Sequence, residues 1–469
     1  MTKFKNFFIA IGQWFKQVGK AIGRWFASWF VSIDNKRAKF VSVGLWFKNW
    51  FVEVDGKPNH FIQIGRWFKS LFVSMNNEEP KLKTLMKKDG TKSIIASLIS
   101  ILCGILIGFI VMLAINPKAA PFGLVKILFG TFVGGTSSIG DTLYYATPLI
   151  MTGLSVGFAF KTGLFNIGAP GQYIFGSFCA IFCALTWQWP WWACVIIAAV
   201  GGAIWGFFPG IFKALFNINE VISSIMFNWI GLFLVYGIVS TNEILYNPRT
   251  AKTFIIPEVS ALPKMGLDKL LPGSNSLNCG IFIAIAVAII IFIVLNKTVF
   301  GFELKACGSN KSASKYAGIK EKRTIVLSMV IAGALAGIGG SLYYLVGGVY
   351  GATLSIGLTA LPATGFNGIP VALLALSHPL GIILSALFMG ALTVGGDMLQ
   401  PAYEKVLVDV IIGIIIYFAA FAVFIKQLLE TQRKKKADKI SVGESGKGIL
   451  PENVSTESVN DKDDVGGDK

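Results

Sequence analysis

Long runs of apolar residues with almost no charge dominate this chain. The sequence has 469 residues, of which 54% are hydrophobic and only 14% are charged, whereas a soluble domain usually carries about 25% charged residues. Several runs reach the ~20 apolar residues that a helix needs to cross the hydrocarbon core. Because the runs are continuous and do not alternate with polar residues, they exclude a β-barrel. The sequence therefore predicts an all-α, polytopic helical membrane protein.

These runs predict about ten transmembrane helices. An even number places both termini on one side, and the excess of Lys and Arg in the loops assigns that side to the cytoplasm. We therefore expect a multi-pass protein of the plasma (inner) membrane. The expected spans are Ser93–Ile115, Thr142–Phe160, Gly168–Leu185, Trp192–Phe212, Val221–Ser240, Cys279–Leu295, Thr324–Val346, Gly357–Ser377, Pro379–Gly395 and Lys405–Ile425. A further piece, Pro117–Phe132, is expected to be re-entrant or interfacial, and Gly333-xxx-Gly337 indicates a close helix contact.

Residues 1–92 are expected to form a separate cytoplasmic tail before the transmembrane domain, 93–425. Residues 1–93 contain 17 Lys or Arg against 6 Asp or Glu, and a 21-residue repeat recurs at Ile22–Val31, Val43–Val52 and Ile64–Val73. Each unit places Trp and Phe on one helical face, which suits the bilayer interface, and β-hairpins are the alternative. The final segment, 426–469, is basic and then acidic, and is expected to be a disordered cytoplasmic tail.

Three apolar segments contain polar or helix-breaking residues: Thr162–Gln172, Gly357–Pro370 and Asn228-Trp229. Broken backbone at membrane depth is tolerated only where it is buried in protein or lines a water-filled cavity. Breaks at matching places in two halves indicate a substrate path near the midplane. The side chains expected to line that path are Phe165, Asn166, Gln172, Asn228, Phe366 and Asn367. The alternative is that these residues only pack helices together.

A basic stretch, Phe302–Arg323, separates two long apolar runs. Seven Lys or Arg lie between Lys297 and Arg323, against Glu303 and Glu321. Short loops with this bias stay cytoplasmic, and a short helix bounded by glycines suits docking into the groove of another protein. The sequence therefore predicts a cytoplasmic coupling loop over 296–323, with a plain membrane-surface loop as the alternative.

A few other polar residues interrupt the spans or their ends. Asp409 is an ionisable residue inside a span and therefore a functional candidate. An ion pair with Lys405 is its structural alternative. Glu220, at the start of a span, is expected to favour the helix dipole, and His378-Pro379 is expected to mark a helix boundary.

Signatures of enzymes and metalloproteins are missing from the sequence. The six cysteines have no metal-ligand spacing, and no Gly-xxxx-Gly-Lys-Ser/Thr phosphate loop occurs, so the chain cannot be its own ATPase. We expect no catalytic residues, no metal and no cofactor. The basic excess is a membrane-surface signal for the lipid bilayer, and no nucleic acid is expected as a partner.

Six ordered motifs resemble those of permease subunits of bacterial nucleoside-type ABC importers, which are relatives of the ribose and branched-chain amino-acid permeases. The motifs are Gly163–Gln172, Asn219–Asn228, Gly308–Ile319, Gly365–Leu374, His378–Gly381 and Leu407–Ile411. The resemblance covers residues 90–425 and implies an ABC importer permease-like fold. It also implies three kinds of partner: a second permease subunit, cytoplasmic ABC ATPase subunits and an extracytoplasmic substrate-binding lipoprotein.

The resemblance implies import of nucleosides or a related sugar-containing solute, driven by the separate ATPase subunits. Within it, Gly308–Ile319 is the ATPase-docking segment. The residues assigned to this coupling are Gly308, Asn310, Tyr316, Ala317 and Gly318. Pro170 stands where the family motif is expected to have Glu, which removes a charge from the path. The alternatives are an ATP-independent facilitator or channel for a small polar solute, and a membrane scaffold built on the N-terminal repeats.

Overall fold

A computed structural model describes residues 89–348, 351–355, 361–419, 421 and 424. The predicted N-terminal repeats and C-terminal tail lie outside these residues. The packing described below belongs to one unit of the chain, Ser93–Lys469.

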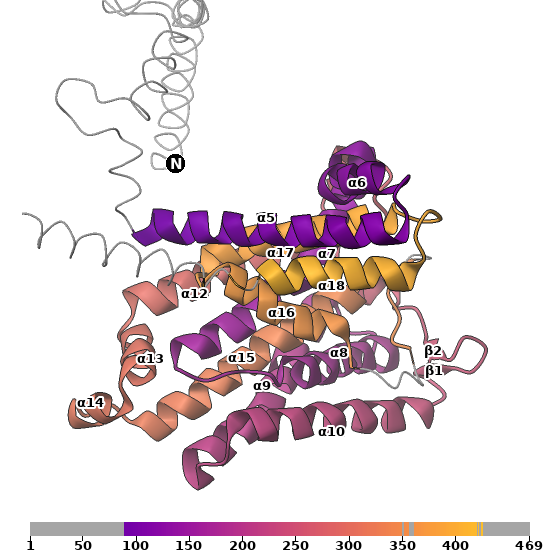
Figure 1. Ribbon diagram of the computed structural model, residues 1–469. Helices are drawn as coiled ribbons and strands as arrows, with labels where there is room; N and C mark the ends of the chain where they lie inside the picture. The colour runs from indigo at the N-terminus through magenta and orange to yellow at the C-terminus, as the bar shows by residue number, and fades with distance from the viewer. Residues whose placement is uncertain (1–88, 349–350, 356–360, 420, 422–423, 425–469) are drawn as a thin grey trace, which may run out of the picture. The chain divides into compact units, whose positions relative to one another are not determined.

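The described part of the chain is mostly helical, with one short antiparallel strand pair in which Tyr246 lies opposite Thr253 (Figure 1). The elements are α5 (Asp89–Ile115), α6 (Ala120–Val133), α7 (Gly135–Lys161), α8 (Ala169–Thr186), α9 (Trp191–Phe216), α10 (Glu220–Ser240), β1 (Tyr246–Asn247), β2 (Lys252–Thr253), η1 (Glu258–Ser260), α11 (Leu267–Leu270), α12 (Gly280–Lys297), α13 (Val299–Ser309), α14 (Lys311–Tyr316), α15 (Glu321–Tyr344), α16 (Ala363–Leu374), α17 (Pro379–Asp397) and α18 (Lys405–Ala419).

Eight of the described helices are long and apolar enough to cross a membrane, namely α5, α7, α8, α9, α10, α12, α15 and α17. Two of the ten expected spans are shorter in the described residues. α16 has 12 residues, because it begins after Pro362 and ends before Leu376 and Ser377, whose φ angles are positive. α18 has 15 described residues. The expected re-entrant piece is α6, a continuous apolar helix of 14 residues.

Glycines allow the central helices to approach closely. Gly202 and Gly206 of α9 lie against Gly333 and Gly337 of α15, and a Cβ added to Gly337 would overlap the carbonyl oxygen of Ala198. α15 also packs against α7 and α8. Without a hydrophobic force between helices in lipid, such close van der Waals contact is what holds them together. The helix contact expected at Gly333-xxx-Gly337 is confirmed.

The backbone break expected after α7 is confirmed, whereas the one expected in the fifth span is wrong. α7 ends at Lys161 and α8 begins at Ala169, so residues 162–168 are not helical. α10, in contrast, continues through Asn228 without interruption. The amide of Asn228 interrupts the apolar sequence but not the helix, because its hydrogen bonds go to another element.

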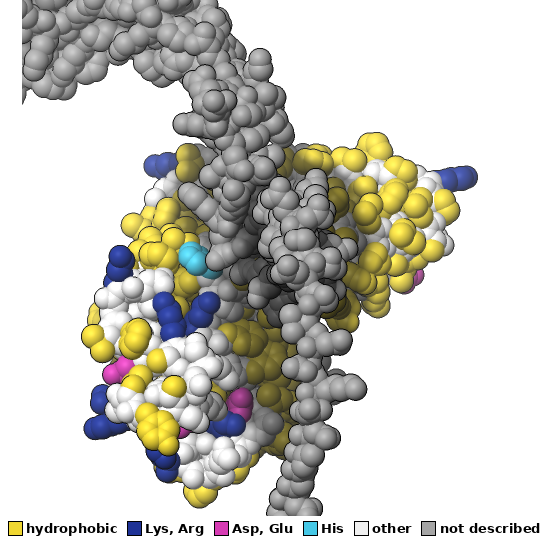
Figure 2. Space-filling model, turned by 60° about the vertical axis from the view of Figure 1, so that its left-hand side comes forward, with side chains coloured by type: hydrophobic (Ala, Val, Ile, Leu, Met, Phe, Trp, Pro, Cys, Tyr) yellow, Lys and Arg dark blue, Asp and Glu magenta, His cyan; other side chains and the backbone are white. Residues whose placement is uncertain are grey.

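Basic side chains lie at one end of the bundle (Figure 2), and half-exposed tryptophans lie beside the loop at the other. Figure 1 shows α13 and α14 at one end and β1 and β2 at the other; we call these ends the α13–α14 face and the β1–β2 face. Lys and Arg side chains, dark blue in Figure 2, gather on the α13–α14 face. Trp187 and Trp192 are about half exposed beside the loop of the β1–β2 face, where the Ser260 hydroxyl donates to the Trp189 carbonyl.

We expect Gly337→Ala to destabilise the fold and Gly237→Ala to leave it intact. Both changes gain the same helix propensity, but only the first adds a methyl group where the backbone of α9 lies, while a Cβ on Gly237 meets no atom within 4 Å. Overpacking of this kind costs about 1–3 kcal/mol. Thermal unfolding of the two purified variants measures it, and equal unfolding temperatures would contradict the packing argument.

Candidate functional site

The break between α7 and α8 lies on the side of the bundle nearer the α13–α14 face. Ser155 of α7 accepts a hydrogen bond from Asn166 in the break. It lies six residues before the end of α7, which corresponds to about 9 Å along the helix axis. Gly163 has a φ of 73°, which favours glycine, and turns the chain back toward the bundle. The Thr162 and Ser328 hydroxyl oxygens lie 2.7 Å apart and connect the break to α15.

Two side-chain amides, those of Asn166 and Gln172, hydrogen-bond each other across the break. Asn166 Nδ2 donates to Gln172 Oε1 (2.8 Å) and to Ser155 Oγ (3.0 Å), and Gln172 Nε2 donates back to Asn166 Oδ1 (3.1 Å). Both residues are at most 1% exposed. A buried amide without partners is costly, so this reciprocal pair allows a polar, irregular segment to exist inside an apolar bundle.

Asn228 satisfies the backbone of the break from a different helix. Its Oδ1 accepts from the N–H of Gly171 (2.9 Å), and its Nδ2 donates to the carbonyl of Ile167 (2.9 Å). Gly171 lies in the first turn of α8, where N–H groups have no partner within the helix. Asn228 on α10 therefore caps α8 through a tertiary contact.

Two serines beside these amides were not predicted from the sequence. Ser155 accepts from Asn166. Ser224 is fully buried, and among the described residues its hydroxyl has no hydrogen-bond partner. A Cβ on Gly168 would lie 3.2 Å from Ser224 Oγ and equally far from Gln172 Nε2, so this hydroxyl lies near the amide pair. The sequence signal for Ser224 was its position four residues before Asn228, which places both side chains on one face of the helix.

The second predicted motif, Gly357–Pro370, packs against the first, Thr162–Gln172. α16 places Gly365 against Pro170, the second residue of α8, and Gly368 against Thr152 of α7. Next to Gly365, Phe366 is 37% exposed. Asn367 is half-buried, and its side-chain amide makes no hydrogen bond to another described residue.

Of the six residues predicted for the path, the structure connects three in one place. Asn166, Gln172 and Asn228 surround the break, and Phe366 and Asn367 lie on the helix that packs against it. Phe165 stacks on Phe160, with ring centroids 5.0 Å apart, at the end of α7. The amides of Asn166, Gln172 and Asn228 are thus engaged with the protein itself.

The predicted coupling segment consists of two short helices, α13 and α14. Asn310 caps α14 by accepting from the N–H of Ala313 (3.0 Å), and Ala317 follows its last residue. Gly318, with a φ of 81°, ends the turn, while Ile319 N–H donates to the Ser314 carbonyl. Tyr316 is 94% exposed. The segment therefore presents an aromatic side chain to the outside on a capped, well-defined helix.

A backbone contact joins the coupling segment to the break. A Cβ on Gly308, near the end of α13, would overlap the carbonyl oxygen of Lys161 and lie 3.0 Å from the Gly163 nitrogen. A Cβ on Gly163 would in turn lie 3.2 Å from Gly308 Cα. The end of α13 therefore rests directly on the start of the break.

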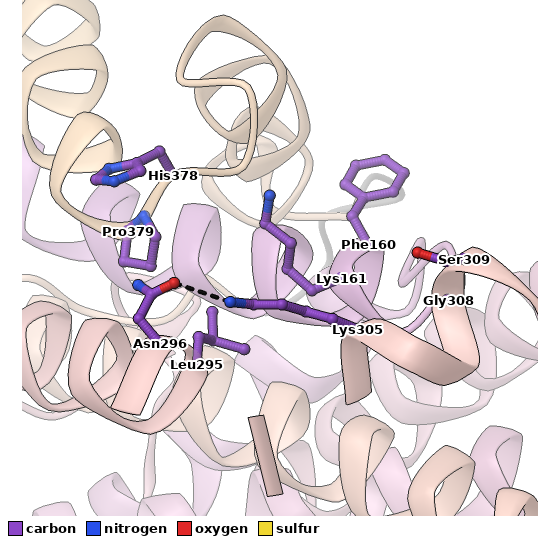
Figure 3. A pocket seen from close by; sticks show the side chains of 9 residues that line it. All are labelled: Phe160, Lys161, Leu295, Asn296, Lys305, Gly308, Ser309, His378 and Pro379. Atoms are coloured by element: carbon purple, nitrogen blue, oxygen red, sulfur yellow. Dashed lines mark hydrogen bonds between the residues drawn. The ribbon is translucent and has the colours of Figure 1, made fainter. Parts of the chain in front are cut away.

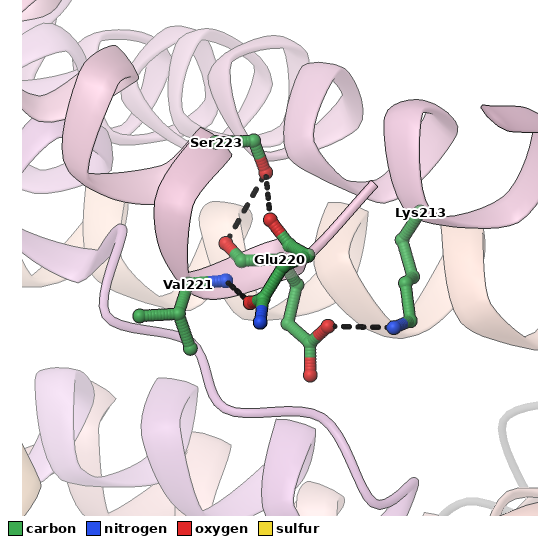
Figure 4. Close-up of polar contacts among 5 residues, drawn as sticks. Lys213, Glu220, Val221 and Ser223 are labelled. Atoms are coloured by element: carbon green, nitrogen blue, oxygen red, sulfur yellow. Dashed lines mark hydrogen bonds and ion pairs between the residues drawn. The ribbon is translucent and has the colours of Figure 1, made fainter. Parts of the chain in front are cut away.

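The corner between α9 and α10 carries an ion pair. Lys213 Nζ and Glu220 Oε2 are 2.9 Å apart, and the Asn219 side chain accepts from Val221 N–H (Figure 4). Glu220 is the first residue of α10, which confirms its expected place at the start of a span.

Asp409, the predicted intramembrane charge, is exposed on α18, and the described residues give it no ion-pair partner. No group of three or more His, Cys, Asp or Glu in the described part of the chain could hold a metal ion.

Comparison with known proteins places this arrangement in a family. Residues 138–420, more than half of the chain, match the family described as the permease component of the branched-chain amino acid transport system. This chain belongs to that family. The permease is accordingly a transport subunit and not an enzyme.

Three relatives are similar over long stretches. The guanosine ABC transporter permease protein NupP of Bacillus subtilis is 36% identical over 74% of this permease and 98% of its own length. The nucleoside ABC transporter permease protein NupB of Lactococcus lactis is 38% identical over 76% and 98%. The guanosine ABC transporter permease protein NupQ of Bacillus subtilis is 28% identical over 56% and 84%.

We expect Asn228→Ala to destabilise the permease. The change leaves Gly171 N–H buried without a partner, at a cost of about 1–3 kcal/mol, and also removes the bond to the half-buried Ile167 C=O. Thermal unfolding should show a lowered transition for this variant. Asn367→Ala is the matched control, and an equal transition for both variants would refute the capping role.

Proposed function

We propose that this permease is the subunit of an ATP-binding-cassette importer that moves nucleosides or a related sugar-containing solute across the plasma membrane. The observation that carries the substrate class is the similarity to NupP and NupB over almost their whole lengths. Separate ATPase subunits supply the energy, since the chain has no phosphate loop of its own.

The α13–α14 face is proposed to be cytoplasmic. The exposed Lys315, Lys320 and Lys322 lie there, in agreement with the positive-inside rule. Ser97 Oγ donates to the Leu374 carbonyl (2.7 Å), so α5 starts near the end of α16 on this face. α18 packs antiparallel to α5, because Ile415 meets Gly104 and Ile411 meets Gly108. Both termini would then be cytoplasmic.

Transport follows from the connection between the coupling segment and the break. ATPase subunits would dock on α14 around Tyr316, and their movement would reach residues 162–168 through Gly308. Alternating access would then occur around the break, with Phe366 and Asn367 meeting the solute. No covalent bond is made or broken in the permease.

The importer is proposed to contain a second permease subunit and an extracytoplasmic substrate-binding lipoprotein. NupP and NupQ, both named as guanosine permeases of one bacterium, support a pair of different permease subunits. Exposed Asp409 on α18 is a candidate for contact with such a subunit. An ATP-independent facilitator is the second candidate, but the exposed Tyr316 on a capped helix favours a docking partner.

Uptake in a strain lacking the gene tests the substrate class. Labelled nucleosides, pentoses and branched-chain amino acids are supplied to cells with and without the restored gene. We expect restored uptake of nucleosides only. Asn367→Leu should lower that uptake about tenfold, because it removes one hydrogen bond to the solute. Restored amino-acid uptake alone would reject the nucleoside proposal, and full uptake by Asn367→Leu would remove that residue from the path.

We expect Tyr316→Asp to abolish the coupling of ATP hydrolysis to uptake. The new carboxylate would be buried without a partner when the ATPase docks, which costs several kcal/mol. The side chain is 94% exposed in the permease itself, so folding should be unaffected. Uptake and ATPase activity in the reconstituted importer measure the effect. Tyr316→Phe is the control, and normal uptake by Tyr316→Asp would contradict docking at this site.

A further inference from the structure

Buried polar side chains without a hydrogen-bond partner are rare in proteins, and each one needs an explanation. In the cavity of about 450 Å³ beside α13, the Lys305 ammonium donates to Asn296 Oδ1 at 2.8 Å (Figure 3). The hydroxyl of Ser224, inside the bundle, differs from these groups. It is fully buried, and no described residue bonds it.

The neighbouring serine makes a bond that Ser224 does not make. Ser223 Oγ donates to the carbonyls of Asn219 and Glu220, both at 3.2 Å, which is the usual bond of a serine to its own helix. The Ser224 hydroxyl has no such bond. It lies near the amide pair of the break, 3.2 Å from the position that a Cβ on Gly168 would take.

Gly168 leaves room on this side of the break. Its φ of −72° and ψ of −3° are angles that any residue adopts, so the backbone does not require glycine here. A Cβ would lie 3.1 Å from Asn166 Oδ1 and 3.2 Å from both Gln172 Nε2 and Ser224 Oγ. Three polar atoms, from the break, α8 and α10, therefore face one point at which Gly168 has no side chain.

Each of these three groups has hydrogen-bonding capacity left. A glutamine amide has two N–H groups, and Gln172 donates one of them to Asn166 Oδ1. An amide oxygen accepts two bonds, and Asn166 Oδ1 accepts this one. The Ser224 hydroxyl can both donate and accept. Among the described residues, nothing else bonds the second N–H of Gln172, the second lone pair of Asn166 or the hydroxyl.

We propose that a single water molecule binds at this position, held by Asn166, Gln172 and Ser224. The water would accept from Gln172 Nε2, donate to Asn166 Oδ1 and make its third bond to the Ser224 hydroxyl. Three hydrogen bonds are typical of a buried water. All three side chains are at most 1% exposed, so the position is closed to larger solutes in this conformation, and water is the ligand that fits.

The water would give α10 a second connection to the break. Asn228, four residues after Ser224, bonds Gly171 and Ile167 directly. A direct bond is lost when its two atoms separate, whereas a bridging water can follow a displacement of either partner and keep both groups bonded. The proposed water therefore allows the break to shift relative to α10 without leaving a buried polar group unpaired, whichever solute the permease carries.

The first test is an experimental structure of the full chain in lipid, without added solute, at a resolution that shows ordered waters. We expect one density peak within hydrogen-bond distance of Asn166 Oδ1, Gln172 Nε2 and Ser224 Oγ. Because no solute is added, a hydroxyl at this position must come from water. Peaks for other buried waters control for the resolution, and absence of this peak while they are visible would overturn the proposal.

Thermal unfolding of Ser224→Ala is a second test, and its result has a definite sign. Removal of an unpaired hydroxyl would relieve a buried polar group and raise the unfolding temperature. Removal of a hydroxyl bonded to the water takes away one of the water's bonds and lowers it. Ser223→Ala is the matched control, because it gains the same helix propensity on the same helix and loses only bonds to carbonyls of that helix.

We expect Ser224→Ala to unfold about 2 °C below Ser223→Ala. An unfolding temperature of Ser224→Ala equal to that of Ser223→Ala, or above it, would overturn the proposal even if a density peak were present, because the water would then not be bonded to the serine. Neither measurement involves uptake, so failure of the nucleoside proposal would leave both results unchanged.

Discussion

In a membrane, each backbone group that leaves a helix must find its hydrogen-bond partner inside the protein. In the break between α7 and α8, Asn228 of α10 meets this requirement for Gly171 N–H and Ile167 C=O, while the side-chain amides of Asn166 and Gln172 satisfy each other. Hydrogen bonds have a narrow range of length and direction. The bonds of Asn166 and Asn228 therefore fix the separation of α7, α8 and α10 near the α13–α14 face. The contacts of Pro170 with Gly365 and of Gly163 with Gly308 depend on that separation.

The sequence could predict what depends on local pattern. The apolar runs gave the positions of eight long helices, and the helix boundary expected at His378-Pro379 is the start of α17. The role of Asn228 could not be predicted in this way. Its partners, Gly171 and Ile167, are 57 and 61 residues away in the sequence, and an asparagine within an apolar run looks the same whether it interrupts its helix or caps another. The short length of α16 likewise depends on the backbone around Leu376 and Ser377.

Pro170, where the resemblance led us to expect Glu, is compatible with the start of α8. It is the second residue of α8, where a backbone N–H would have no partner within the helix, so its absence costs nothing there. Its fixed φ also suits the start of a helix. The ring is buried against Gly365, whose lack of a side chain leaves the space. Pro170 therefore preserves the start of α8 and its contact with α16.

The contacts between the coupling segment and the break are made by backbone atoms. Gly308 meets Gly163, and beyond the amide pair Pro170 meets Gly365. A long side chain at such a contact could change rotamer and absorb a displacement of α13. Glycine has no rotamer to change, and closely packed interiors transmit strain because they compress little. A displacement at α14 would therefore pass through Gly308 to residues 162–168 and from there to α16, where the side-chain amide of Asn367 makes no hydrogen bond to another described residue.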